Sequence, residues 1–331
     1  MPAVLVTGAS GFLGPAVCRA LLDRGFEVRG LTRSREARLE PGVSRFLIAD
    51  LTDARSIESA VRGTSAVVHL AGRAHIADRA GVSSERGFQL ANAEGTKAVL
   101  AAAITAGTKR ILFASTIKVM GEYRGRPWTE TDVPAPSDAY GRSKLAAEAS
   151  LLGAAAKGDI EAGILRLPLV YGAGVKANML QLFKLVDAGV PLPLGNIANR
   201  RSIVYAGNVA AGFLALLDAT DLGGDVFFVS DGEAVSSTAL IEMIAHSLGR
   251  PARLFSFPRT FLRGVARAAD PFAGGMAMAS PSAALARLTE SLECSPEKIQ
   301  SAFAFKAPWS TREGIALTAR WYRESRQGIE T

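Results

Sequence analysis

The chain has no long hydrophobic run. Over its 331 residues, no stretch approaches the 18 or more consecutive apolar residues that a membrane-spanning helix requires. Met1 and Pro2 lead straight into a short apolar segment, without the basic region and long apolar core of a signal peptide. We therefore expect a cytoplasmic protein with no membrane partner.

Cysteine and histidine are also scarce. The two cysteines and three histidines are scattered, without the spacing of a zinc or redox motif, so the sequence predicts no metal site. The net charge is +7, but arginine and lysine are spread evenly with little aromatic interleaving, and we expect no nucleic-acid partner. A basic balance of this kind suits a multiply anionic small molecule, or it reflects no more than a solvated basic surface.

The first segment combines a strand, a glycine-rich turn and a helix. Residues 3–7 are apolar and β-branched, Gly8, Gly11 and Gly14 follow, and a helical apolar pattern then runs to Gly25. Small residues let the backbone approach a phosphate, and a helix N-terminus offers N–H groups and partial positive charge. The Gly-x-x-Gly-x-x-Gly spacing differs from the commoner Gly-x-Gly-x-x-Gly fingerprint. The segment predicts a cradle for a pyrophosphate.

Further strand-like runs alternate with helical patterns. Residues 45–50 and 65–72 are near-continuously apolar, which is typical of a parallel sheet covered on both faces. Helical patterns lie between them and again at residues 85–106. Strands that alternate with helices form right-handed βαβ units. We therefore predict an α/β fold with a doubly wound parallel sheet.

The end of the second predicted strand, residues 27–33, bears on the cofactor. Folds that bind NAD usually carry an acidic residue there, which holds the ribose 2′-hydroxyl. This strand ends instead in Thr32-Arg33-Ser34-Arg35, with no carboxylate. An arginine suits a 2′-phosphate, so we expect NADP in preference to NAD, unless these arginines are simply solvated.

A tyrosine and a lysine, Tyr140 and Lys144, lie four residues apart in a predicted helix. Residues at this spacing share one face of a helix, and an ammonium beside a phenol lowers the tyrosine pKa. Thr116, at the end of the strand predicted at 111–116, would supply a hydroxyl that hydrogen-bonds a substrate oxygen. These three residues are the candidate catalytic group for proton transfer.

Several motifs together resemble one family. They are Thr7 to Gly14, Asp50-Leu51, Leu70-Ala-Gly72, Asn92, Ser115-Thr116, Tyr140-x-x-x-Lys144 and Arg166-Leu-Pro168-Leu-Val-Tyr171-Gly172. In order and approximate spacing they resemble the extended short-chain dehydrogenase/reductases. Within that superfamily the chain is similar to the branch of nucleotide-sugar epimerases, dehydratases and ketoreductases, over nearly its whole length.

The resemblance implies a site for NADP or NAD. The glycines would cradle the pyrophosphate, Asp50 would bond the adenine amino group, and Lys144 would bind the nicotinamide ribose. With Arg33 added from the strand end, the expected cofactor-binding residues are Gly8, Ser10, Gly11, Phe12, Gly14, Arg33, Asp50, Leu51, Leu70, Ala71, Gly72, Tyr140, Lys144 and Pro168.

The resemblance also implies a nucleotide-sugar substrate. Thr116 and Tyr140 would contact the C4 oxygen of the sugar, with Tyr140 as acid or base. Asn178 and Arg201 match family residues that contact the diphosphate. Lys118 has no role in the resemblance, and it faces either substrate or solvent.

The chain divides after residue 171, where the pattern changes to shorter elements. We expect a Rossmann domain for NAD(P) at residues 1–171, with segments near 200–232 returning to it. A smaller C-terminal α/β substrate-binding domain would take up most of 172–331, and residues 270–281 read as an insertion rich in small residues. The family pairs two long helices across a dimer interface, so a homodimer is expected.

Departures from the family pattern bear on the reaction. Sugar 4,6-dehydratases carry Asp-Glu directly after the catalytic threonine, where this chain has Ile117-Lys118, so dehydration is disfavoured. The main prediction is a UDP-sugar 4-ketoreductase of surface-polysaccharide synthesis, with Tyr140 as proton donor, because NADP suits reductive chemistry. The alternative is a UDP-sugar 4-epimerase with tightly bound NAD. Further alternatives are a reductase of non-nucleotide ketones and a non-catalytic NADP-sensing protein.

Overall fold

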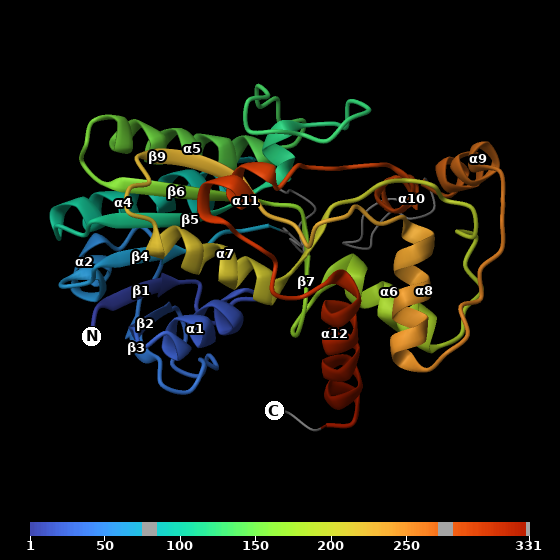
Figure 1. Ribbon diagram of the computed structural model, residues 1–331, viewed down its shortest axis with the longest axis horizontal. Helices are drawn as coiled ribbons and strands as arrows, with labels where there is room; N and C mark the ends of the chain where they lie inside the picture. Colours follow the sequence, from blue (N-terminus) through green and yellow to red (C-terminus); the bar gives the residue numbers. More distant parts are fainter. Residues whose placement is uncertain (75–84, 271–280, 329–331) are drawn as a thin grey trace.

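Two lobes make up the fold. The computed structural model describes residues 1–74, 85–270 and 281–328. Figure 1 shows a larger lobe, in which a sheet lies between layers of helices, and a smaller, mainly helical lobe beyond the carboxyl ends of the strands. Nearly all of the predicted insertion at 270–281 lies outside the described residues. The domain boundary at residue 171 stays a prediction.

Seven parallel strands form the central sheet, in the order β3-β2-β1-β4-β5-β6-β9. The strands are β1 (Ala3–Thr7), β2 (Glu27–Thr32), β3 (Ser44–Leu47), β4 (Ala66–His69), β5 (Arg110–Thr116), β6 (Glu161–Leu167) and β9 (Gly224–Phe228). The order reverses at β1, which lies between β2 and β4. Such a reversal opens a crevice at the carboxyl edge, where ligands bind. The predicted doubly wound parallel sheet is confirmed.

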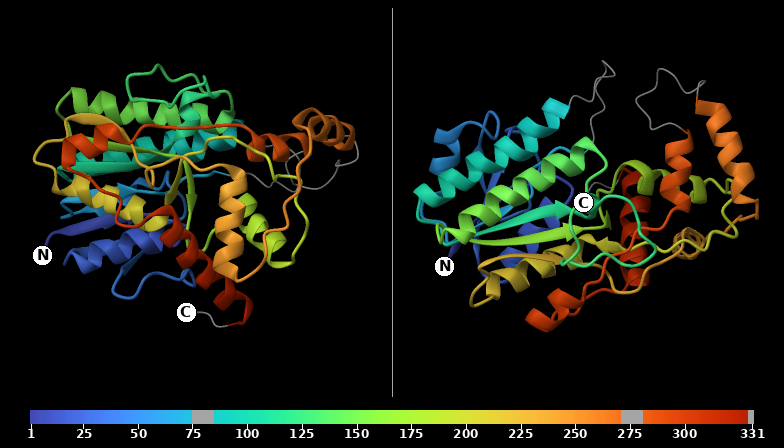
Figure 2. Two further views of the ribbon diagram at one scale, coloured as in Figure 1. Left: turned by 45° about the vertical axis from the view of Figure 1, so that its right-hand side comes forward. Right: turned by 90° about the horizontal axis from the view of Figure 1, so that it is seen from above.

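Helices cover both faces of the sheet. One face packs against α1, α7 and α11, and the other against α2, α4 and α5 (Figure 2). Their bounds are α1 (Gly14–Asp23), α2 (Ala54–Val61), α4 (Gly95–Thr105), α5 (Ala139–Ala156), α7 (Ala206–Asp218) and α11 (Glu297–Phe303). Strands β1 and β4 are buried along their whole length, because a parallel sheet between two helical layers exposes neither face.

The helix predicted at 85–106 is interrupted. It consists of α3 (Glu85–Phe88), a π-helical segment η1 (Gln89–Glu94) and α4. The side chain of Asn92 lies in the π-helical segment and bonds groups outside the helix. Single π-helical turns inside α-helices are frequent at functional sites.

The smaller lobe packs helices against a pair of short parallel strands. Its elements are β7 (Leu169–Tyr171), α6 (Ala177–Asp187), β8 (Ile203–Tyr205), α8 (Ser237–Leu248), α9 (Arg259–Ala269), α10 (Pro281–Thr289) and α12 (Thr311–Arg326). A separate apolar core joins α6, α8 and α12 to the two strands. A short 3-10 helix, η2 (Ile117–Met120), follows β5 in the larger lobe.

One carboxylate joins the two lobes. Asp231 accepts hydrogen bonds from the hydroxyl of Tyr171 at 2.6 Å and from the Tyr205 main chain and the Asn208 amide at 2.7 Å each. Asn208 lies on α7 of the larger lobe, and its amide also donates to the carbonyl of Trp309 before α12 at 2.7 Å. Asp231 therefore connects β7, β8 and α7 at one point.

Candidate active site

The turn between β1 and α1 leaves little room for side chains. Gly8 has a φ of 71°, and a Cβ there would lie 2.8 Å from the main-chain nitrogen of Ala71. A Cβ at Gly14 would overlap the carbonyl oxygen of Ala9. The N-cap of α1 is Leu13, whose side chain cannot accept a hydrogen bond. The N–H of Gly14 donates to the carbonyl of Gly11 and Pro15 has no N–H, so the N–H of Ala16 is the group of the first turn that faces an anion. The turn, which contains the predicted residues at 8–14, fits a pyrophosphate.

Other predicted cofactor residues lie beyond the ends of β2 and β3. Arg33 directly follows β2, and its side chain is exposed. Asp50 forms a turn in which the Thr52 hydroxyl and N–H bond its carboxylate and lower its pKa. β3 ends at Leu47, before this turn, so the strand predicted at 45–50 is too long. Leu51 packs beneath the start of α4.

A buried histidine at the end of β4 fixes the loop that follows. The hydroxyl of Thr7 donates to His69 Nδ1 at 2.6 Å, and His69 Nε2 lies 2.9 Å from the hydroxyl of Thr96. The Thr96 hydroxyl donates to the carbonyl of Asn92, so we assign the ring hydrogen to Nε2. Burial lowers the pKa of His69 to about 3, so the ring is neutral. The N–H of Ala71 donates to Thr7, which holds the loop against the cradle.

Asn92 joins this loop to α5. Its amide accepts from the N–H of Arg73 at 2.7 Å, and donates to the Arg73 carbonyl at 3.1 Å and to the Ser143 hydroxyl at 2.9 Å. A Cβ placed at Gly72 would lie 2.9 Å from Asn92 Oδ1 and 3.6 Å from Lys144 Nζ. The structure therefore brings the predicted cofactor loop beside the predicted lysine.

Tyr140 and Thr116 meet where the end of β5 faces the first turn of α5. Burial raises the pKa of Tyr140 to about 12, although a hydrogen bond with the Thr116 side chain lowers it. The expectation that Lys144 lowers this pKa is wrong for the described structure. The lysine ammonium instead lies over the ring of Phe113, 3.9 Å from its centroid.

The groups around the buried Lys144 have opposite effects on its pKa. Burial lowers the pKa of its ammonium to about 7, while the negative charge of Glu148, one turn further along α5, raises it. The face of the Phe113 ring also favours the charged form. Perturbed groups of this kind cluster at functional sites, which makes Lys144 a candidate functional residue of this edge.

An ion pair is buried behind Lys144. Arg166 Nη2 lies 2.7 Å from Glu148 Oε2, and the two side chains are only 5% and 1% exposed. The hydroxyl of Ser115 donates to the same carboxylate. The sequence analysis did not single out Glu148, although it continues the four-residue spacing of Tyr140 and Lys144 along one helix face.

Comparison with known proteins identifies the family. The model of the NAD dependent epimerase/dehydratase family matches residues 4–229. The chain belongs to that family. It is therefore an enzyme of an NAD-dependent family, and its assignment to the extended short-chain dehydrogenase/reductases is confirmed.

Relatives of this epimerase/dehydratase resemble it over nearly the whole chain. A UDP-glucose 4-epimerase of Vibrio cholerae is 31% identical, covering 97% of this chain and 96% of the relative. An N-acetyl-α-D-glucosaminyl-diphospho-ditrans,octacis-undecaprenol 4-epimerase of Escherichia coli O157:H7 is 26% identical, covering 96% and 94%. The crystal structure of the Thermus thermophilus UDP-glucose 4-epimerase in complex with NAD is 26% identical with a TM-score of 0.75, covering 97% and 99%.

Lys118 of this epimerase/dehydratase lies next to the catalytic candidates. Its Nζ forms an ion pair with Asp138 Oδ2 at 2.6 Å and lies 6.0 Å from the centroid of the Tyr140 ring. Asp138 also caps α5 by accepting from the N–H of Gly141 at 2.7 Å. Lys118 thus holds the residue that begins the helix of Tyr140, and its side chain remains 49% exposed.

Three other predicted residues lie toward the smaller lobe. Pro168 is buried between β6 and β7. Asn178 is exposed in the first turn of α6, directly after Ala177, whose φ of 51° is unusual for a residue with a side chain. Arg201 precedes β8, and its guanidinium donates to the carbonyl of Glu290 at 3.0 Å. Burial lowers the pKa of Arg201, and the side chain is partly covered.

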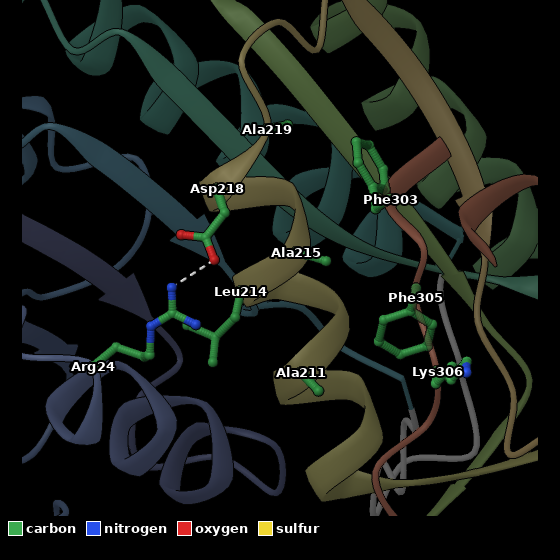
Figure 3. A pocket seen from close by; sticks show the side chains of 9 residues that line it. All are labelled: Arg24, Ala211, Leu214, Ala215, Asp218, Ala219, Phe303, Phe305 and Lys306. Atoms are coloured by element: carbon green, nitrogen blue, oxygen red, sulfur yellow. Dashed lines mark hydrogen bonds and ion pairs between the residues drawn. The ribbon is translucent and has the colours of Figure 1, made fainter. Parts of the chain in front are cut away.

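A groove of about 470 Å³ lies on the opposite face of the sheet from α5. It is formed by α1, α7 and the segment after α11, and it contains an exposed ion pair between Arg24 and Asp218 (Figure 3). The remaining lining is largely apolar, including Phe303 and Phe305. The candidate catalytic residues of this epimerase/dehydratase lie instead at the carboxyl edge, so this groove is not the candidate active site.

The described residues contain neither a cluster of metal-ligating side chains nor a membrane-spanning helix. Within residues 1–74, 85–270 and 281–328, no cluster of three or more His, Cys, Asp or Glu side chains could hold a metal ion. Over the same ranges, no helix has the length and apolar character needed to cross a bilayer.

Proposed function

We propose that this family member is a UDP-sugar 4-epimerase. The observation that carries the proposal is the convergence of Thr116, Tyr140 and Lys144 beside the cradle and the Gly72 loop. Support comes from two family relatives that are UDP-glucose 4-epimerases, one of them in complex with NAD. A sugar joined to a diphosphate is common to these substrates and to the lipid-linked substrate of the Escherichia coli relative.

Thr116 and Tyr140 have different roles in the proton transfer at the C4 oxygen. When bound by the glycine-rich turn and the loop at 70–72, a nicotinamide cofactor would supply the hydride acceptor and donor for C4 of the sugar. Thr116 holds the C4 oxygen by a hydrogen bond, and Tyr140 removes its proton as the keto sugar forms and returns it when the alcohol is restored. The ammonium of Lys144, which lies beside the loop at Gly72, would bind the nicotinamide ribose.

The binding roles follow the geometry of the two lobes. The glycine-rich turn would hold the cofactor pyrophosphate, Asp50 the adenine end, and the loop at 70–72 the ribose. Asn178 and Arg201 would hold the substrate diphosphate from the smaller lobe, where a planar guanidinium suits paired phosphate oxygens. Two copies would form a homodimer, as the resemblance to the family implies.

A 4-ketoreductase using NADPH is the second candidate, and Arg33 is the observation that favours it. The arginine is exposed directly after β2, where NAD-binding folds usually place a carboxylate. Titration of the protein with NADPH and NADH tests the assignment. Tighter binding of NADPH that Arg33→Ala abolishes would favour the reductase, whereas equal binding would remove its support.

The direct test of the epimerase is conversion without added cofactor. Purified protein is incubated with UDP-glucose or UDP-N-acetylglucosamine, and the C4 epimers are resolved by NMR. We expect interconversion by cofactor retained through purification, and loss of turnover in Arg201→Ala. Reduction of a UDP-4-keto sugar that consumes NADPH, with no epimer formed, would replace the epimerase by the reductase. Full turnover in Arg201→Ala would refute the diphosphate role.

A further inference from the structure

An arginine-rich segment leads into and through α9. Residues 250–269 contain five arginines and no aspartate or glutamate. The same segment exposes three phenylalanine rings and a valine, which we call the phenylalanine patch: Phe255, Phe257, Phe261 and Val265, between 40% and 54% exposed. A positively charged segment thus carries an apolar surface that the fold leaves in solvent.

The phenylalanine patch is continuous. The rings of Phe255 and Phe257 have their centroids 5.7 Å apart, and those of Phe257 and Phe261 are stacked at 5.0 Å. Val265 lies one turn beyond Phe261 on the same face of α9. Contiguous exposed apolar patches of this kind mark interaction sites, whereas single exposed apolar residues are normal on a protein surface.

The helix α9 is amphipathic, and its polar face is basic. At 100° per residue, Arg263 and Arg267 point away from Phe261 and Val265. Both arginine side chains are exposed, and Arg263 is within 3.8 Å of an equally exposed carboxylate on Glu290. The helix packs against α10 through its half-buried residues and lies at the right-hand edge of the molecule in Figure 1.

We propose that the phenylalanine patch and its flanking arginines form a docking surface for a bilayer of anionic phospholipid. A helix with exposed apolar residues on one face, as Phe261 and Val265 are on α9, and arginines on the other can lie in the plane of a membrane interface. The rings enter the boundary between headgroups and acyl chains, and the arginines contact lipid phosphates. A second copy is a poorer occupant, because its own patch segment, residues 250–269, contains no carboxylate that could pair with the arginines.

The proposal goes beyond the reaction and does not rest on it. The sequence-based expectation of no membrane partner depended on the lengths of apolar runs, which detect a spanning helix and not one lying in the surface. If α9 docks on a bilayer, the smaller lobe would connect the bilayer surface to the carboxyl edge of the sheet (Figure 1).

Vesicle flotation of the full chain tests the docking surface. We expect binding to vesicles of phosphatidylcholine with a quarter phosphatidylglycerol, weakening with salt, and little binding to phosphatidylcholine alone. Each arginine near an anionic surface raises the partition coefficient about fivefold, so the double variant Arg263→Gln with Arg267→Gln should lower this coefficient about 30-fold. The matched control is Arg312→Gln with Arg320→Gln, which removes the same charge from exposed positions of α12 and should stay within about twofold of wild type under the same surface model.

A second pair of variants tests the apolar contribution. Phe257→Ser with Phe261→Ser should lower binding at least tenfold, whereas Val133→Ser, at a 76% exposed position in another region, should not change it. Circular dichroism would verify that each variant is folded. Equal binding to neutral and anionic vesicles, or unchanged binding in both patch variants, would overturn the proposal. So would concentration-dependent self-association that the phenylalanine variants abolish without any vesicle binding, which would assign the patch to a second copy.

Discussion

One buried ammonium, that of Lys144, lies at the candidate active site. Lys144 lies near the cofactor loop at Gly72, over the face of Phe113, and one helical turn from the carboxylate of Glu148. Desolvation favours its neutral form, while the aromatic face and the carboxylate favour the charged form. The resulting pKa of about 7 means that small changes around Lys144 alter its charge at neutral pH.

Removing the phenol tests the role of Tyr140. Tyr140→Phe should lower turnover by about 10²–10⁴-fold, the range for loss of a general acid or base. Dinucleotide binding should persist, because the glycine-rich turn is unchanged. Turnover close to that of wild type, measured on the same UDP sugar, would refute the assignment.

Glu148 should set the pH dependence of cofactor binding through Lys144. The ammonium form binds an anionic dinucleotide better, so affinity should fall as pH rises through the pKa of Lys144, about 7 in the free protein. Glu148 raises that pKa, and in Glu148→Gln the fall should therefore begin at lower pH, as measured by fluorescence titration.

Ser115→Ala is the matched control for Glu148. It removes a hydrogen bond to the same carboxylate without changing its charge, so the midpoint should move much less. Because Glu148→Gln leaves Arg166 buried without its partner, thermal unfolding must be followed in parallel. An identical midpoint in wild type and folded Glu148→Gln would contradict the coupling.

At the scale of elements, local sequence patterns predicted turns and helices, whereas the contacts between elements distant in the sequence could not be predicted. The glycine spacing predicted the turn between β1 and α1, and the four-residue spacing predicted that Tyr140 and Lys144 share α5. The pair of Glu148 with Arg166 could not be predicted, because its members meet only when α5 packs on β6. The π-helical turn at Asn92 depends in the same way on partners from other elements.

Two glycine substitutions compare a packed turn with an open helix. Gly14→Ala should destabilise the protein and weaken dinucleotide binding, because the new Cβ would overlap main-chain oxygens of the cradle. Gly153→Ala, on an exposed position of α5 with open space around it, should stabilise the protein by about 0.5–1 kcal/mol. Chemical denaturation of both variants measures the difference. Equal effects at the two positions would show that the cradle is not closely packed.

At the scale of the whole molecule, Asp231 connects the two lobes. Asp231→Ala leaves the buried Tyr171 hydroxyl and two N–H donors without this acceptor, at about 1–3 kcal/mol for each group left unsatisfied. The control Asp218→Ala breaks an exposed ion pair with Arg24 and should change the free energy of unfolding by only about 0–1 kcal/mol. Similar decreases in the free energy of unfolding of both variants, measured by denaturation, would contradict the role of Asp231 in connecting the two lobes.

Epimerisation requires that both lobes act on one sugar, so that C4 is oxidised and reduced again within a single site. The most direct measurement is the fate of deuterium in UDP-glucose labelled at C4, incubated with purified protein and no added cofactor. We expect a C4 epimer that retains the deuterium, because hydride removed from C4 is returned to the same carbon. An epimer in which solvent hydrogen has replaced the label would contradict it.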